Sequence, residues 1–344
     1  MTQQPTTLYI IGNGFDLLHG VKSSYSAFRE YLKRHDKSLS FEMDCYFECE
    51  NFWGDFENSL AFLSREMVME SVDTMLDMNM TTFDEDDDDF SYADYFASIE
   101  MGTQVIPDLI DNLPLRFKKW IKTLHPQAGK NESCDKLLEQ GALYINFNYT
   151  EFLETLYGIP IDNILYIHGD RRDKKKELIL GHGRDPDKDF IDWFERNKGK
   201  KRFSDYRSGK KGRRYRNDSL TYLNYFQEDE RKGNWRNPIR YYAADSATGT
   251  IEGYFYHSAK KTQVIVTDNL AFFDSLKGIE EIVVIGHSLS PVDHPYFRKI
   301  TEENATPDEL HWKISWYSDA DKDRIRKFAA MMGIDEQNIE MFHL

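Results

Sequence analysis

The sequence predicts an α/β protein with a doubly wound, mainly parallel sheet that carries two large, mostly helical insertions. Three observations support this fold class. Short apolar runs typical of buried strands alternate with longer segments of helical spacing. Most of these runs end at a glycine or a polar turn. Their spacing is uneven, with one run at the start, three between residues 142 and 180 and two near the end, so we expect two interruptions of the sheet.

Six segments fit buried strands, because each is short, apolar or aromatic, and followed by turn residues. In chain order they are 7–11, 142–147, 163–167, 178–180, 281–285 and 311–317. Five segments repeat apolar residues at the three- and four-residue spacing of a helix face. They are 25–34, 52–69, 104–124, 262–277 and 319–332.

The strand spacing predicts a single core formed by about residues 1–21, 136–184 and 261–344. The first insertion, 22–135, is expected to be helical and contains a solid acidic run at 84–89, for which an exposed loop is expected. The second insertion, 185–260, is basic and aromatic. Its segment 196–216 holds eleven lysines or arginines against one acid.

Composition excludes several classes of protein. A hydrophobic fraction of 40% in 344 residues is too high for a disordered chain. The net charge of −15 argues against a surface that mostly coats nucleic acid or anionic membrane. No apolar stretch approaches the roughly 18 residues of a membrane span, and the N-terminus lacks the pattern of a signal peptide. We therefore expect a cytoplasmic protein without a membrane partner.

The cysteines and acids do not predict a metal site. Cys45, Cys49 and Cys134 are too few for a disulfide scaffold and do not complete a zinc set, so reduced thiols are expected. The acids at 84–89 are consecutive rather than spaced like a calcium loop.

A glycine turn follows the first predicted strand and opens a helix at Leu17. Glycines at this position let the backbone approach a phosphate, and a helix N-terminus offers N–H groups to it. Leu17 stands where the usual dinucleotide fingerprint has its third glycine, so an ordinary nicotinamide dehydrogenase is not expected. The predicted nucleotide-binding residues of this turn are Gly12, Asn13, Gly14 and Asp16. Asp16 could instead cap the helix, and His19 could be structural or face the ligand.

Polar clusters follow three further predicted strands, where ligand-contacting residues of such sheets gather. Asn146 and Asn148 alternate and are suited to orienting a water or a sugar hydroxyl. His168 could accept a proton near neutral pH, although an isolated histidine at a strand end is usually structural. The fourth cluster contains Gly286, His287, Ser288 and, a few residues later, Asp293. We predict that these residues bind the nucleotide, because glycine, a polar side chain and serine at a strand end can hold a ribose or phosphate through backbone N–H groups.

The fourth cluster also resembles the nucleophile elbow of a serine hydrolase. That elbow needs a glycine where Ser290 stands, and it needs a histidine far downstream. Pro291 is awkward for the helix that should follow. We therefore rank this interpretation well below nucleotide binding.

Together, the clusters resemble the bacterial abortive-infection AbiH family. The matching motifs are IIGNGFDLLHG (10–20), NFNYT (146–150), IHG (167–169), LGHG (180–183) and IGHSLSPVDHPYF (285–297). That family looks related to sirtuin-like nucleotide-binding proteins with a Rossmann-type core, several of which are NAD-hydrolysing effectors of phage defence. The resemblance covers most of the α/β core and little of either insertion.

The resemblance implies a role for each matching residue. Asn148 would position the water or the ribose, and His168 would act as the base. Gly12 and Gly14 would form the phosphate-binding turn, and Gly286 and Ser288 a second ribose or phosphate turn. Thr150 departs from the pattern, because many sirtuin-like effectors have an aspartate there. Asn13, Phe15 and Asp16 stand where small residues are usual, and a four-cysteine zinc module is missing, so protein deacetylation is not implied.

The leading hypothesis is hydrolysis of NAD, as substrate, at its nicotinamide–ribose bond. The rival hypothesis is a nucleotide-sensing or nucleic-acid-binding defence module without this chemistry. Its support is segment 196–216, in which Phe203, Tyr206 and Tyr215 lie between basic residues, a mixture that can stack bases and contact phosphates. A solvated loop, or a partner for the acidic run within the chain or in a homo-oligomer, is the simpler explanation of that segment.

Overall fold

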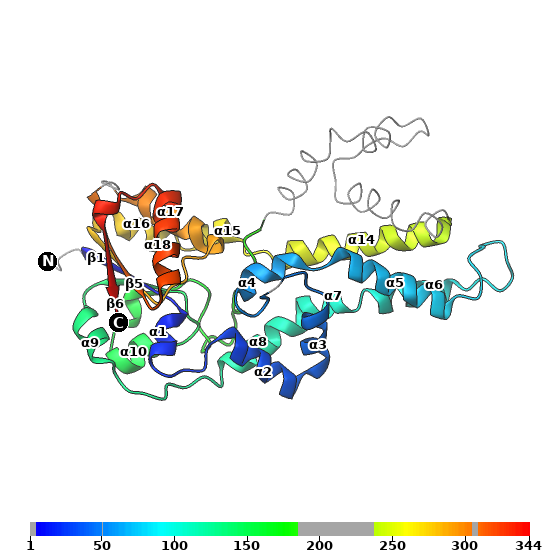
Figure 1. The fold of residues 1–344 in the computed structure, drawn as a ribbon, viewed down its shortest axis with the longest axis horizontal. Helices are drawn as coiled ribbons and strands as arrows, with labels where there is room; N and C mark the ends of the chain where they lie inside the picture. Colours follow the sequence, from blue (N-terminus) through cyan, green and yellow to red (C-terminus); the bar gives the residue numbers. More distant parts are fainter. Residues whose placement is uncertain (1–4, 50, 185–236, 305–308) are drawn as a thin grey trace. The chain divides into compact units, whose positions relative to one another are not determined.

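The computed structural model describes residues 5–49, 51–184, 237–304 and 309–344 (Figure 1). The chain divides into two compact units. The sheet unit comprises Met1–Arg34, Pro114–Gly183 and Lys260–Leu344, and the helical unit comprises His35–Leu113 and Arg184–Ala259. The sheet unit thus includes residues 22–34 and 114–135, which the strand spacing assigned to the first insertion. The basic segment 196–216 lies outside the described residues.

The sheet unit contains a six-stranded sheet in the order β3-β2-β1-β4-β5-β6, and every neighbouring pair is parallel. The strands are β1 (Thr7–Ile11), β2 (Leu143–Asn146), β3 (Ile164–Tyr166), β4 (Glu281–Ile285), β5 (His311–Trp316) and β6 (Ile339–His343). This arrangement confirms the predicted doubly wound α/β class. The order reverses between β1 and β4, and folds of this kind bind ligands beyond the carboxyl ends of the strands at that point.

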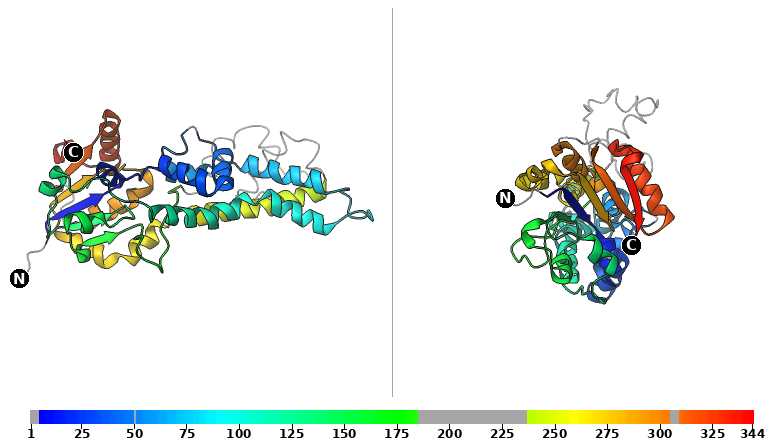
Figure 2. Two further views of the ribbon diagram at one scale, coloured as in Figure 1. Left: turned by 90° about the horizontal axis from the view of Figure 1, so that it is seen from below. Right: turned by 90° about the vertical axis from the view of Figure 1, so that its left-hand side faces the viewer.

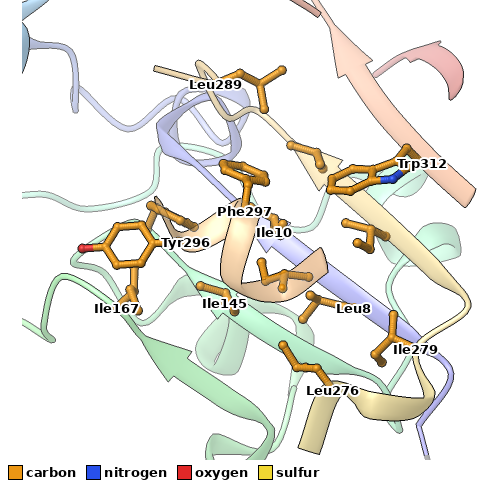
Figure 3. Packing of buried hydrophobic residues seen from close by; sticks show 14 of the residues in the cluster. Leu8, Ile10, Ile145, Ile167, Leu276, Ile279, Leu289, Tyr296, Phe297 and Trp312 are labelled. Carbon is orange, nitrogen blue, oxygen red and sulfur yellow. The ribbon is translucent and has the colours of Figure 1, made fainter. Parts of the chain in front are cut away.

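Register explains how one face of the sheet forms the core. Ile10 pairs with Ile145 on one side and with Val284 on the other, so alternate residues of the central strands share a face. These residues pack against Phe297 and other apolar side chains of the C-terminal helices in a single buried cluster (Figure 3). On the opposite face, the rings of Tyr9 and Tyr144 stack with their centroids 4.8 Å apart.

Helices connect the strands of the sheet unit. Between β1 and β3 they are α1 (Asn13–Leu18), α2 (Tyr25–His35), α8 (Leu113–Ile121), α9 (Glu132–Leu137) and α10 (Phe152–Tyr157). After β3 they are α15 (Thr262–Asp268), α16 (Leu270–Asp274), α17 (His294–Glu303) and α18 (Asp319–Met332). The capping box of Ser318 and Asp321 fixes the start of α18, and Gly333 in the left-handed conformation ends it.

The helical unit is built around three long helices, α5 (Arg65–Asn79), α6 (Tyr92–Gly102) and α14 (Pro238–Ser258), which lie side by side (Figure 2). Shorter helices are α3 (Lys37–Cys45), α4 (Phe56–Ser59) and α7 (Val105–Pro107). Helices α5 and α6 approach closely at Gly102, which has no side chain. A Cβ atom at this position would lie 2.5 Å from the Cα of Val72. The acidic run 84–89 lies in the exposed loop between α5 and α6.

Several expected elements differ from the structure. The predicted strand at 178–180 is wrong: the chain there joins no sheet, and the N–H of Ile179 donates to the carbonyl of His168 at 2.9 Å. The predicted helix 52–69 is broken, because Ser64 caps a new helix by accepting from the N–H of Met67. The predicted helix 262–277 is broken at Asn269.

No described helix is both long and apolar enough to cross a membrane.

Candidate functional site

The predicted site residues lie at the carboxyl ends of β1, β2, β3 and β4, all within the sheet unit. Most of them form two buried polar groups. The aspartate–asparagine cluster consists of Asp16, Asn146, Asn148 and Thr150. The histidine–lysine cluster consists of His168, Lys260, His287 and Asp293.

The glycine turn after β1 packs directly on the turn after β4. The N–H groups of Gly12 and Gly14 donate to the carbonyls of Ile285 at 2.9 Å and Gly286 at 2.7 Å. A Cβ atom on Gly12 would lie 2.5 Å from the Cα of His287, and one on Gly14 would lie 2.6 Å from the Cα of Gly286. Close contact between two backbone turns therefore requires both glycines, and these two N–H groups already have acceptors.

Asp16 does not cap helix α1, whose N-cap is Gly12 without a side-chain hydrogen bond. Instead its buried carboxylate accepts from Asn148 Nδ2 at 2.9 Å and from Thr150 Oγ1 at 2.7 Å. Burial raises the pKa of Asp16 to about 7, against the opposing effect of the hydrogen bonds from Thr150 and Asn148. Asp16 thus ties α1 to the turn after β2.

The two asparagines have different environments, although their spacing is regular. Asn146 shapes the turn after β2, because its Oδ1 accepts from the N–H of Asn148 and its Nδ2 donates to the carbonyl of Thr150. Asn148 donates from Nδ2 to Asp16 and to the carbonyl of Gly12 at 3.0 Å. The hydrogen bonds that the Asn148 side chain makes to described residues use Nδ2, so Oδ1 is an acceptor that the cluster can offer to a ligand.

The histidine–lysine cluster is centred on the carboxylate of Asp293. Its Oδ1 lies 3.4 Å from Lys260 Nζ and 3.6 Å from His168 Nε2, and its Oδ2 lies 3.4 Å from His287 Nε2. Burial favours the neutral acid, but the neighbouring Lys260 ammonium and the hydrogen bond from His287 outweigh it and hold the pKa of Asp293 well below its usual range. The cluster therefore contains a buried ion pair flanked by two imidazoles.

His168 offers a hydrogen-bond acceptor inside this cluster. Its imidazole bonds to the carbonyl of Phe147, while no donor among the described residues bonds to Nε2. Nδ1 must therefore carry the proton, and Nε2 presents a lone pair. Burial, reinforced by the Lys260 charge, lowers the pKa of His168 to about 3, so the ring is neutral at neutral pH.

The turn after β4 holds His287 in the opposite tautomer. Its Nδ1 accepts from the N–H of Leu289 at 2.9 Å, which leaves the proton on Nε2, facing Asp293. Leu289 adopts a φ of +55°, a conformation rare for a branched side chain. His294 Nε2 lies 3.1 Å from the carbonyl of Leu289 and completes the support of this turn.

Some predicted residues stand outside both clusters. Asn13 donates from Nδ2 to the carbonyl of Ser23 at 3.0 Å, and Ser288 is exposed. His19 is fully buried and structural, with Nδ1 2.7 Å from the carbonyl of Phe15 and Nε2 2.5 Å from Tyr157 Oη.

Lys260 is the one residue of the histidine–lysine cluster that the sequence analysis did not predict. It belongs to none of the motifs and stands two residues after the end of α14, at the last position of the predicted second insertion. The only signal was a lysine pair, Lys260 and Lys261, at the boundary between the insertion and the core.

In the described ranges, no group of three or more histidines, cysteines or acids is arranged to hold a metal ion.

A protein-family model, Bacteriophage abortive infection AbiH, matches residues 8–316 of the chain. The matched range runs from β1 to the end of β5 and includes both polar clusters. No curated protein and no solved structure matches the chain.

Proposed function

The chain belongs to the bacteriophage abortive infection AbiH family, and from this premise we propose that it defends its host by hydrolysing NAD at the nicotinamide–ribose bond. The observation that carries the proposal is the Nε2 lone pair of His168, which no protein donor occupies among the described residues and which lies 3.6 Å from the Asp293 carboxylate. The open lone pair gives His168 the geometry of a general base, and the adjacent Asp293 charge, which acts to raise the pKa of His168 against the effect of burial, favours the protonated ring.

The proposed reaction needs few protein groups. The oxygen of a water molecule forms a bond to the ribose C1′, and the C1′–N bond breaks with its electron pair passing to the nicotinamide ring. The nicotinamide leaves as a neutral molecule, so it needs no acid. His168 Nε2 accepts the proton of the attacking water, and the Asp293 carboxylate stabilises the resulting imidazolium. Asn148 Oδ1 accepts a hydrogen bond from the water or a ribose hydroxyl.

The strand order supports a nucleotide as the ligand. Both clusters lie at strand carboxyl ends around the reversal between β1 and β4, where doubly wound sheets bind nucleotides. Gly12 lies between the two clusters, because its carbonyl accepts from Asn148 and a Cβ atom built on it would collide with the Cα of His287. This proximity supports a single ligand that contacts both.

The test is to incubate purified protein with NAD, alone and with extract of phage-infected cells, and to measure nicotinamide release. We expect His168→Gln and Asn148→Ala to lower the rate by about 100-fold or more, since each removes a group that acts on the reacting atoms. His311→Gln is the matched control, because His311 is exposed at the start of β5, and it should keep the wild-type rate. Absence of nicotinamide from the wild type under both conditions would overturn the proposal.

A second candidate, a nucleotide sensor without hydrolysis, is favoured by the internal hydrogen bonds of Asn148. Both hydrogens of its amide are committed to Asp16 and Gly12, which leaves one acceptor for a ligand. NAD-induced thermal stabilisation without nicotinamide release would favour this candidate.

A further inference from the structure

A lysine side chain is completely buried in the candidate site. Lys260 has 0% of its side chain exposed, and its Nζ lies 3.4 Å from Asp293 Oδ1. Its backbone N–H donates to the carbonyl of His182 at 2.8 Å, which fixes the start of the side chain beside the cluster. Burying an ammonium group and a carboxylate is costly even when they pair, because both lose their hydration, so the presence of Lys260 in this cluster calls for a specific reason.

One carboxylate oxygen serves two neighbours. Asp293 Oδ1 faces both the Lys260 ammonium and the Nε2 of His168, at 3.4 Å and 3.6 Å. A buried carboxylate without the lysine would attract a proton onto His168. His287 is closer to Asp293, but its Nδ1 lone pair already accepts from the N–H of Leu289, whereas Nε2 of His168 has an open lone pair. With the lysine present, the charge of Asp293 is already balanced.

We propose that Lys260 is a positioning residue of this site, whose buried ammonium keeps Asp293 ionised and His168 uncharged, so that Nε2 remains free to accept a proton from the ligand. This inference rests on the proposed role of His168 as a base and extends it to a residue outside the sequence motifs. Among the described residues, the charged or ionisable groups with the largest electrostatic effect on His168 are Lys260, Asp293 and His287. Lys260 and Asp293 carry opposite charges, so removing either one leaves the other unbalanced.

The proposal is tested by the protonation of His168 itself, without any substrate. Protein labelled with ¹⁵N-histidine is titrated by NMR, and loss of a signal in His168→Gln assigns the ring. In the wild type we expect His168 to stay neutral, with its proton on Nδ1, across the range in which the protein remains folded. In Lys260→Met we expect protonation to begin at a pH higher by about one unit or more, since a nearby cation has been removed.

Three further variants complete the design. Lys261→Met is the matched control, because Lys261 is the adjacent residue and exposed, and its titration should follow the wild type. Lys260→Arg keeps the charge and should leave His168 neutral. Lys260→Met combined with Asp293→Asn removes both charges and should return His168 to a neutral ring, which also covers the case in which Lys260→Met alone unfolds. The inference would be overturned if the titration of His168 were unchanged in folded Lys260→Met. It would also be overturned if the His168 ring were charged in the double variant.

The same variants separate this inference from the proposed function. If the protein hydrolyses NAD, the acid limb of the pH–rate profile should move to higher pH in Lys260→Met, because the base must be unprotonated. A shifted His168 titration with no nicotinamide from any variant would support the role of Lys260 and reject the hydrolase.

Discussion

At the residue scale, burial shifts the pKa values of two side chains of this site, Asp16 and His168, toward their uncharged forms. Burial raises the pKa of Asp16 to about 7 and lowers that of His168 to about 3, so both residues approach neutrality in the folded protein. Each is placed by hydrogen bonds to neighbouring turns rather than by solvent. The site therefore depends on the protonation states that the fold imposes.

Asp16→Asn should reveal the charge state of this carboxyl through stability. The folded-state pKa of about 7 lies above the value of 3.8 for an unperturbed aspartate, so the folded protein binds a proton that the unfolded chain lacks between these values. The resulting stabilisation is present in acid and is lost as the pH rises through about 7. We expect the free energy of unfolding of the wild type, relative to Asp16→Asn, to fall by about 3 kcal/mol from pH 5 to pH 8. Urea unfolding at each pH measures it.

Asp268→Asn is the control for this experiment, because Asp268 is exposed. Its stability relative to the wild type should not vary over the same range. A constant difference between wild type and Asp16→Asn from pH 5 to pH 8 would contradict a carboxyl that titrates near neutrality.

At the scale of elements, the sequence predicted most accurately the strands that are buried on both faces of the sheet. Strands β1 and β4 are almost wholly buried, and their continuous apolar runs revealed them. Strand β6 was missed because it is an edge strand with half-buried and exposed positions, where Glu340 and His343 interrupt the pattern. Segment 178–180 was mistaken for a strand because its apolar side chains serve a loop that is bonded to Tyr149 and His168.

The candidate site, like the fold, was predictable from the sequence only in part. Polar residues that directly follow strands, such as Asn148 and His168, can be located from the strands alone. Lys260 could not be found in this way, because it reaches the cluster from a helix boundary and only the tertiary fold brings it to Asp293. The contact of Asp16 with Thr150 was equally hidden, since the two residues are 134 positions apart.

Gly14→Ala tests whether the glycine turn is required by packing between β1 and β4. A methyl group at Gly14 would lie 2.6 Å from the Cα of Gly286, and backbone atoms cannot rotate away. We expect a loss of about 3 kcal/mol in the free energy of unfolding. Gly158→Ala is the comparison, because Gly158 has a φ of +73° but open space around it, so only about 1 kcal/mol of backbone strain is expected. Equal losses in the two variants would contradict the packing explanation.

At the scale of the whole molecule, neither unit is formed by one continuous stretch of chain. The sheet unit uses three segments and the helical unit uses two, so the chain passes between them several times. In the helical unit, α14 returns to helices whose sequence lies far upstream, and the buried Arg240 connects them. Its guanidinium pairs with Asp73 at 2.5 Å and with Asp77, and it lies 4.0 Å from the centre of the Phe83 ring.

Arg240→Met tests whether the two units are separate in stability. The substitution removes the guanidinium that pairs with the buried carboxylate of Asp73, which should cost about 3 kcal/mol within the helical unit. If the unit opens on its own, amide hydrogen exchange in α5, α6 and α14 should accelerate by about 100-fold, while the strands of the sheet keep their wild-type rates. Arg326→Met removes an exposed ion pair with Asp323 and should change neither unit measurably. If exchange accelerated equally in the strands of the sheet, the two units would unfold together as one cooperative body. A substitution in the helical unit would then affect the histidine–lysine cluster only by lowering the stability of the whole protein.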